Sequence, residues 1–267
     1  VTGGKYRASR GTTFLGFTST ISNLGAGTIF EHVNGTVNID ASTNTNPVDL
    51  NFNAGTSSSE GALFNHVTFS FVVGSQANQR RLTGDMAVAG TLTFATGESD
   101  EVLIADASLR TIYLKGNFVM GVGTGTFGTN TNLRLMMNGT TAQTVTHSAG
   151  SFGARFEVNK TSGSDADKTV SLSTNFTINT NGSLVMTAGR LDVLTRTLDT
   201  NGPYTHNGGD VLNSGGGEIL ASSTFTQTGG TISRVNFDGG TATLTQSGGS
   251  ITNLVFISKG FGICNGV

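Results

Sequence analysis

The sequence predicts an all-β solenoid in which short strands stack coil upon coil, with about 20 residues per coil. Three observations predict this fold. The 267 residues include 39 glycines, two prolines and no tryptophan, together with abundant Thr, Ser and Asn, which is typical of strands joined by tight turns. The hydrophobic content of 36% includes 17 phenylalanines, so the chain can bury a core. The third observation is an internal repeat.

The repeat is a nine-residue phrase that occurs four times in the C-terminal third, beginning at Leu184, Tyr204, Phe225 and Leu244. Successive copies start 20, 21 and 19 residues apart. A constant period with strand-type alternation inside each copy is typical of one coil of a β-solenoid, and fits neither a sandwich nor a helical repeat. At this period the whole chain would form about 13 coils and a rod roughly 60 Å long.

Alternation within the phrase predicts which side chains face the interior. The first and eighth positions are apolar and are expected inside: Leu184, Tyr204, Phe225 and Leu244, then Leu191, Val211, Ile232 and Ile251. The third position is also expected inside, and its polar members can hydrogen-bond along the stack as amide ladders do: Met186, His206, Gln227 and Gln246. The second and fourth positions are expected outside: Thr205 with Asn207, Thr226 with Thr228, and Thr245 with Ser247.

Each copy contains a sharp corner and is followed by a second short strand. The corner is Gly-Gly in three copies and Ala188-Gly189 in the first. Glycine permits a positive φ without a Cβ clash, so these residues are suited to a sharp turn. Two or three strands per coil predict a triangular or flattened cross-section. Residues 56–59, 121–132 and 162–167 are expected to be loops that protrude from the coils.

Two regions are expected along the chain. Residues 86–267 carry the regular solenoid coils, whereas residues 1–85 form a less regular N-terminal β region with wider coils or a separate head. No linker rich in proline or charge separates the two regions.

The segments 138–145, 151–152, 157–161 and 184–191 resemble repeat regions of large bacterial cell-surface proteins. The resemblance is to autotransporter passengers and filamentous haemagglutinin-like adhesins, and covers roughly residues 85–256. It implies a right-handed parallel β-helix. The resemblance is compositional rather than catalytic, so it transfers no functional residue to this chain.

The charge content argues against nucleic acid and anionic membranes as partners, and the cysteine content excludes a disulfide within the chain. The chain has 15 Lys plus Arg against 17 Asp plus Glu, so no strong field attracts nucleic acid or an anionic membrane. No apolar stretch is long enough to span a bilayer, and no signal peptide is recognisable. The single cysteine, Cys264, cannot form a disulfide within the chain and is expected to be an ordinary thiol.

Carboxylates could act as catalysts or bind calcium. Enzymes that use parallel β-helices need clustered carboxylates on adjacent coils, but Asp192, Asp199 and Asp210 occupy different positions of the repeat and are expected to be solvated turn residues. The acidic segments 98–101 and 165–167 are weak candidates for calcium, since neither has the spacing of an EF-hand loop.

The remaining motifs also favour a structural interpretation. The histidines His32, His66, His147 and His206 are scattered without metal-ligand spacing, and His206 is expected to fill an interior column. The glycine-rich segment 121–125 lacks the lysine and the following helix of a phosphate loop. The outward threonines resemble the arrays of ice-binding proteins, although Val185 and Asn207 interrupt the array.

The sequence therefore predicts a non-enzymatic module that is secreted or lies at the cell surface, as a structural or adhesive part of a filament, stalk or surface layer. No catalytic residue, metal site or cofactor is expected. Self-association or continuation within a longer chain, and binding to surface glycans, are the expected interactions. The alternative is a carbohydrate-active β-helix enzyme, such as a polysaccharide lyase or hydrolase, and a carbohydrate- or ice-binding face comes third.

Overall fold

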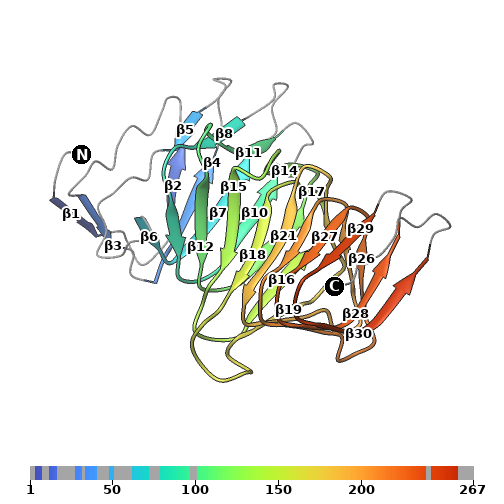
Figure 1. The fold of residues 1–267 in the computed structure, drawn as a ribbon. Coiled ribbons are helices and arrows are strands. Elements are labelled where there is room, and N and C mark those ends of the chain that lie inside the picture. The colour runs from blue at the N-terminus through green and yellow to red at the C-terminus, as the bar shows by residue number, and fades with distance from the viewer. Residues whose placement is uncertain are drawn as a thin grey trace.

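The protein is a β-solenoid of stacked parallel strands (Figure 1). The computed structural model describes residues 4–7, 12–16, 28–31, 34–40, 48–50, 62–71, 79–96, 101–238 and 242–257. Within these ranges the regular structure is entirely strand, without a helix. The solenoid makes about eight turns, with successive turns roughly 23 residues apart. The all-β solenoid that the repeat predicts is therefore confirmed.

Each coil contributes strands to three parallel stacks. The first stack contains β6 (Ala62–Phe64), β9 (Met86–Val88), β12 (Arg110–Leu114), β15 (Leu133–Met137), β18 (Arg155–Asn159), β21 (Ser183–Ala188), β24 (Tyr204–His206), β27 (Thr224–Gln227) and β29 (Thr243–Gln246). At the N-terminal end, β1 (Gly4–Arg7) pairs with β3 (Thr28–Glu31) as a separate two-stranded sheet.

The second stack contains β2 (Thr12–Gly16), β4 (Thr36–Asp40), β7 (His66–Phe71), β10 (Leu92–Thr96), β13 (Phe118–Val122), β16 (Gln143–His147), β19 (Thr169–Leu172), β22 (Arg190–Asp192), β25 (Asp210–Leu212), β28 (Thr231–Phe237) and β30 (Ser250–Phe256). The third contains β5 (Val48–Leu50), β8 (Gln79–Leu82), β11 (Val102–Ala105), β14 (Thr126–Phe127), β17 (Ser151–Phe152), β20 (Phe176–Ile178), β23 (Thr197–Thr200) and β26 (Glu218–Ala221). The long strands β28 and β30 continue from the second stack into the third.

The repeat predicted the interior columns correctly. Leu184, Tyr204, Phe225 and Leu244 follow one another in register across β21, β24, β27 and β29. The first three are buried, and Leu244 in the last coil is half-buried against them. The apolar column at the eighth position, which contains Leu191, Val211, Ile232 and Ile251, is likewise in register.

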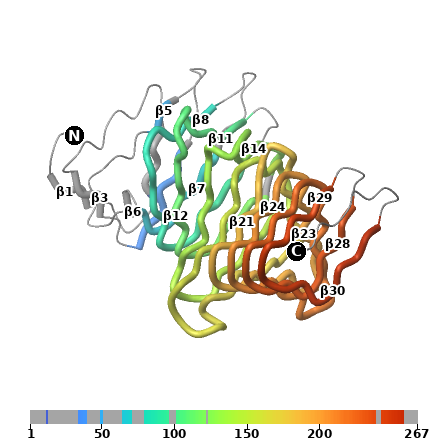
Figure 2. Tube along the Cα trace, in the orientation of Figure 1, coloured from blue at the N-terminus to red at the C-terminus, as the bar shows by residue number. Residues whose placement is uncertain are grey.

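The number of turns is smaller than the repeat predicted, about eight rather than about 13. The reason is that a period near 20 holds only in the C-terminal third, whereas Arg155 and its partner Ser183 in the next coil are 28 residues apart. That coil contains the loop 160–168, exposed at residues 161–166, which protrudes from the body between β18 and β19 (Figure 2). Loops lengthen a coil without adding to the rise of about 4.8 Å per coil, so the rod is shorter than expected.

The three predicted loops have different outcomes. Residues 162–167 form the protruding loop as expected. Residues 121–132 are only partly loop, because the segment includes β14, whose Phe127 is fully buried. Glycine content there indicated a loop but did not reveal the two-residue strand. Residues 56–59 and many others of the predicted N-terminal region 1–85 lie outside the described ranges, so the division at residue 85 remains a prediction.

A phenylalanine cluster fills the middle of the solenoid. The rings of Phe127 and Phe152 stack with centroids 5.3 Å apart and an interplanar angle of 7°. Phe176 meets Phe152 edge to face at 5.1 Å, and Phe156 meets Phe176 at 5.3 Å. These rings come from β14, β17, β18 and β20, so aromatic contacts join successive coils across two of the stacks.

We predict that Phe225→Ala destabilises the protein far more than Thr226→Ala. Phe225 is fully buried, so its truncation should cost about 3–5 kcal/mol, whereas the outward Thr226 should cost less than about 1 kcal/mol. Chemical denaturation of the two variants and the parent measures both losses. Equal losses would show that the inward and outward columns are assigned wrongly.

Candidate functional site

The carboxylates that could have formed a catalytic set do not come together. Asp192 and Asp210 lie in different columns, because the register pairs Asp210 with Arg190 and Asp192 with Leu212. Asp199 belongs to the third stack, opposite Leu220. The spacing of the repeat predicted this separation.

Asp192 is not the solvated turn residue that was expected. It is buried, and its carboxylate accepts bonds from the backbone N–H of Leu194 at 3.0 Å and of Ser214 at 3.2 Å. The Ser214 hydroxyl donates a third bond at 2.6 Å. Asp192 therefore links the turns of two successive coils, and a carboxylate engaged in this way is a structural cap.

In the acidic segment 165–167, the carboxylates of Asp165 and Asp167 are engaged with other groups of the protein. Asp165 pairs with Arg190 at 3.1 Å and with Lys168 at 3.6 Å, and Asp167 accepts from the N–H and hydroxyl of Ser164 at 3.1 and 2.7 Å. Among described residues, no three His, Cys, Asp or Glu side chains gather as a metal-binding group. Residues 98–100 of the other acidic segment lie outside the described ranges, as do His32 and Cys264.

His206 has the interior structural place that the repeat predicted. It is fully buried, with Nδ1 2.8 Å from the Tyr204 hydroxyl and Nε2 3.2 Å from the carbonyl oxygen of Gly209. Burial lowers the pKa of His206, which favours the neutral ring. A neutral ring satisfies both contacts when Nε2–H donates to the carbonyl and Nδ1 accepts from the tyrosine. His206 is thus a polar core residue.

Gln227 and Gln246 follow His206 in the same interior column. Each donates hydrogen bonds to backbone carbonyl oxygens at the corner that follows it in the chain. Gln227 Nε2 lies 3.3 Å from the carbonyl oxygens of Gly229 and Gly230, and Gln246 Nε2 lies 3.4 Å from that of Gly249. Gln246 Nε2 also donates to Gln227 Oε1 at 3.1 Å, so the predicted amide contact between coils is present.

Lys160 is a buried cation that the sequence analysis missed. Only 1% of it is exposed, and its ammonium donates to the carbonyl oxygens of Gly139 at 2.5 Å and Thr141 at 2.8 Å, and to Gln143 Oε1 at 2.7 Å. Burial lowers the pKa of Lys160 to about 8, an effect that the charge of Asp167 opposes. Lys160 follows directly after β18, so it joins a corner of its own coil to the preceding coil. A lone lysine after a strand gives no signal of burial in the sequence.

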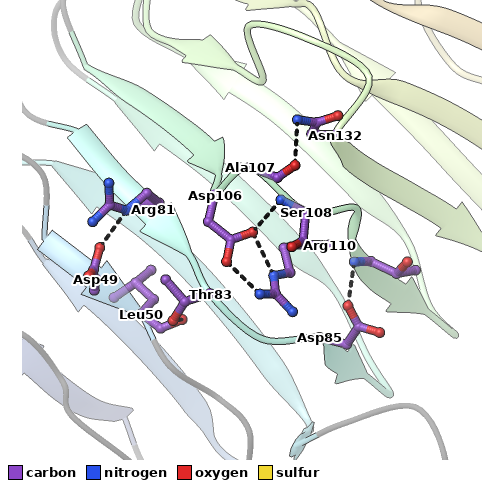
Figure 3. A network of polar contacts seen from close by, with 11 residues as sticks. Asp49, Leu50, Arg81, Thr83, Asp85, Asp106, Ala107, Ser108, Arg110 and Asn132 are labelled. Atoms are coloured by element: carbon purple, nitrogen blue, oxygen red, sulfur yellow. Dashed lines mark hydrogen bonds and ion pairs between the residues drawn. The ribbon is translucent and has the colours of Figure 1, made fainter.

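Ion pairs link the third stack to the start of the first (Figure 3). Arg81 Nε on β8 donates to Asp49 on β5 at 2.6 Å. Asp106 receives two bonds from the guanidinium of Arg110, at 2.8 and 2.5 Å, and this contact is the main cause that lowers the pKa of Asp106. Asp85 accepts from the Thr111 N–H at 2.8 Å. Asp49 and Asp85 therefore bond to the following coil, whereas Asp106 pairs with Arg110 within its own coil.

A second charged cluster lies on the outer face of the first stack and was also missed. Glu157 is 4% exposed although it points outward, because Arg155 at 2.7 Å and Arg134 at 3.4 Å lie beside it. The Thr187 hydroxyl donates to Glu157 at 3.1 Å, and Arg134 also donates to Thr111. Hydrophobic periodicity could not reveal this cluster, since the contacts of Glu157 with Arg134 and Thr187 join residues 23 and 30 positions apart.

The outward column of threonine hydroxyls is too short to form an extended array of the kind that ice-binding proteins have. Thr205, Thr226 and Thr245 follow one another in register over three coils. The column stops at Val185, which is buried, and Asn207 in the adjacent column accepts a bond from Thr228 at 3.0 Å. The interruptions predicted from the sequence are therefore present.

The most distinctive surface is the terminal coil, which we define as residues 242–257 with β29 and β30. Four large hydrophobic side chains are exposed among the described residues, and three of them are in this coil: Leu254 (38% exposed), Phe256 (41%) and Ile257 (54%). Leu254 follows the buried Val235, and Phe256 follows the buried Phe237. The terminal coil thus continues the core columns, but its members of these columns, Leu254 and Phe256, are partly exposed. Residues 258–267 lie outside the described ranges.

Comparison with known proteins finds no relative. No family model matches the chain, and neither a curated protein nor a solved structure matches it. In the part of the chain that the structure describes, no helix is long and apolar enough to cross a membrane.

We predict that Lys160 makes stability depend on pH between about 8 and 10.5. Its folded pKa of about 8 is below the ordinary 10.5, so across this window the unfolded chain holds a proton that the folded chain has lost. The free energy of unfolding should therefore rise with pH, by roughly 3 kcal/mol in total.

Denaturation of the parent and of Lys160→Met at a series of pH values measures this contribution as the difference in slope. Lys168→Met is the control, since Lys168 is a partly exposed lysine in the same loop. A Lys160→Met slope equal to that of the parent would contradict the prediction.

Proposed function

We propose that this chain is a structural or adhesive module of an extracellular or cell-surface assembly, as a segment or subunit of a filament, stalk or surface layer. The observation that carries the proposal is the terminal coil. Core columns that are buried at Val235 and Phe237 reach Leu254 and Phe256 with about two fifths of each side chain exposed. Core side chains that are partly exposed in this way gain stability when further structure covers them.

The chemistry of the other surfaces supports a role without catalysis. Asp192 caps turns, Asp106 is paired with Arg110, and Glu157 is paired with Arg155. Charged groups that are already engaged with the fold contribute stability between coils rather than reactivity. Uncharged hydroxyls remain outward at Thr226 and Thr245, and a face of this kind suits the hydrogen-bonding groups of surface glycans.

We predict that the native protein is found outside the cell, in extended material. Antibodies against this chain, applied to intact cells and followed by electron microscopy, test this directly. Labelled filaments, stalks or surface layers are the expected result. Label that appears only after the cells are permeabilised would overturn the proposal.

We also predict that the purified protein does not turn over acidic or neutral polysaccharides. The physical reason is that Asp192, Asp199 and Asp210 lie in separate columns. Product formation on a polysaccharide panel is the measurement. Turnover that is abolished by a single Asp or Glu substitution would instead support a carbohydrate-active enzyme.

A further inference from the structure

We infer that His206 is an acid-sensitive joint of the solenoid, and that protonation of its ring loosens β24 from its neighbours β21 and β27 in the two adjoining coils. The inference goes beyond the proposed function and does not depend on it. Three features of His206 carry it: the burial of the ring among uncharged side chains, the hydrogen bonds of its two nitrogens, and its contact with the corner of the next coil.

The first feature is the interior column around the ring. The register places His206 between Met186 on β21 and Gln227 on β27, and His206 is fully buried. Neither neighbour in the column carries a charge. A buried imidazolium would therefore lose its hydration without gaining a counter-ion from the column.

Asp210 is the charged residue that acts on the ring, and it is already engaged. Burial lowers the pKa of His206, and the charge of Asp210 and the hydrogen bond to Gly209 oppose this effect. The Asp210 carboxylate pairs with Arg190 at 3.4 Å and accepts from the Thr231 hydroxyl at 2.5 Å. Its charge is thus shared with groups outside the interior column, so the neutral ring remains favoured.

The second feature is that the hydrogen bonds of the ring suit its neutral form. Nδ1 accepts from the Tyr204 hydroxyl at 2.8 Å, and Nε2–H donates to the Gly209 carbonyl at 3.2 Å. Protonation makes both nitrogens donors, so the Tyr204 hydroxyl must turn its own O–H away from the ring. Tyr204 is buried, and in the described part of the chain its hydroxyl has no second hydrogen-bond partner. The protonated pair therefore leaves a buried donor unsatisfied.

The third feature is the contact with the corner of the following coil. A Cβ built on Gly230 would lie 2.3 Å from Nε2 of His206, so the ring and this corner are in close contact. The backbone carbonyl of His206 also accepts from the Thr228 N–H at 2.9 Å. A charged ring that moves toward water must displace this corner. Because each coil of a solenoid is held by its neighbours, the displacement loosens the junction between two coils.

The direction of the pH dependence follows from the lowered pKa. A histidine in an unfolded chain takes up a proton near pH 6.5, whereas folded His206 is still neutral there, so acid favours the open state. The equilibrium constant for opening at β24 should rise by up to about tenfold for each pH unit below about 6.5, until the folded ring is itself protonated.

The repeat supplies the matched variant, His206→Gln. Gln227 and Gln246 occupy the same column and donate to corner carbonyls without titrating. The reporter is hydrogen exchange at the Thr228 amide, measured as protection relative to an unstructured peptide at the same pH, between about pH 7.5 and 5. We expect the parent to lose protection in acid, and His206→Gln to keep the protection that it has at neutral pH.

The control for histidine titration elsewhere is His147→Gln. Burial also lowers the pKa of His147, but this residue lies on β16 in the second stack. The substitution should leave the acid response at Thr228 as it is in the parent. If His147→Gln instead removes that response, the titrating group is His147, and the inference is overturned.

Tyr204→Phe gives a second test that does not require His206→Gln to fold. It removes the hydroxyl that could accept from a protonated Nδ1, so the loss of protection at Thr228 in acid should be larger than in the parent. Combined with His206→Gln it reproduces the Phe225 and Gln227 of the next coil, and this double variant should show no acid response.

Two results would contradict the role of His206. One is an equal acid-induced loss of Thr228 protection in the parent and in His206→Gln. The other is a Tyr204→Phe response no larger than that of the parent, which would show that the hydroxyl and the ring are not coupled to the opening.

Discussion

The structure depends on how the backbone carbonyl groups at the coil corners are satisfied from inside. At each corner between the first and second stacks the chain turns sharply, and Gly189, Gly209, Gly230 and Gly249 adopt positive φ there. Successive corners stack so closely that a Cβ on Gly209 would lie 2.3 Å from the carbonyl oxygen of Gly189. Inside the C-terminal coils, side-chain donors also reach the carbonyl oxygens at the corners: His206 that of Gly209, Gln227 those of Gly229 and Gly230, and Gln246 that of Gly249. The carbonyls of Gly189, Gly209 and Gly230 accept from the backbone N–H groups of Asp210, Thr231 and Ser250 in the next coil, so the side-chain donors add a second bond at Gly209 and Gly230. A buried unsatisfied carbonyl costs about 1–3 kcal/mol, and this bonding between coils avoids that cost where the corners stack.

Lys160 and Gln143 perform the same task in the middle coils with different chemistry. Gln143 accepts from the Gly139 N–H and from Lys160, while it donates to the carbonyls of Leu114 and Gly116. One interior network therefore spans three successive coils. Because the donors are fixed by several bonds each, the cross-section is held from coil to coil, and the aromatic contacts around Phe152 can form in register.

A rod built in this way exposes two kinds of surface. Its sides carry hydroxyls and paired charges, which are stable in water. In the coil of residues 242–257, side chains that continue the core columns are partly exposed, as Leu254 and Phe256 show. A contact that covers this coil buries apolar area, so the coil has more free energy to gain from a contact than the polar sides have. This difference is why we interpret the chain as part of an assembly.

The sequence by itself determined the fold class and the C-terminal columns, because a 20-residue period with strand alternation allows only one side of each strand to face the core. Leu184, Tyr204, Phe225 and Gln227 could all be placed from the repeat. Only the tertiary structure decided the number of turns, the strand β14, and the burial of Lys160, Asp192 and Glu157. The physical reason is that these features depend on contacts between residues about 20 to 30 positions apart. Their polar partners follow no hydrophobic period, so only the stacking of the coils brings them together.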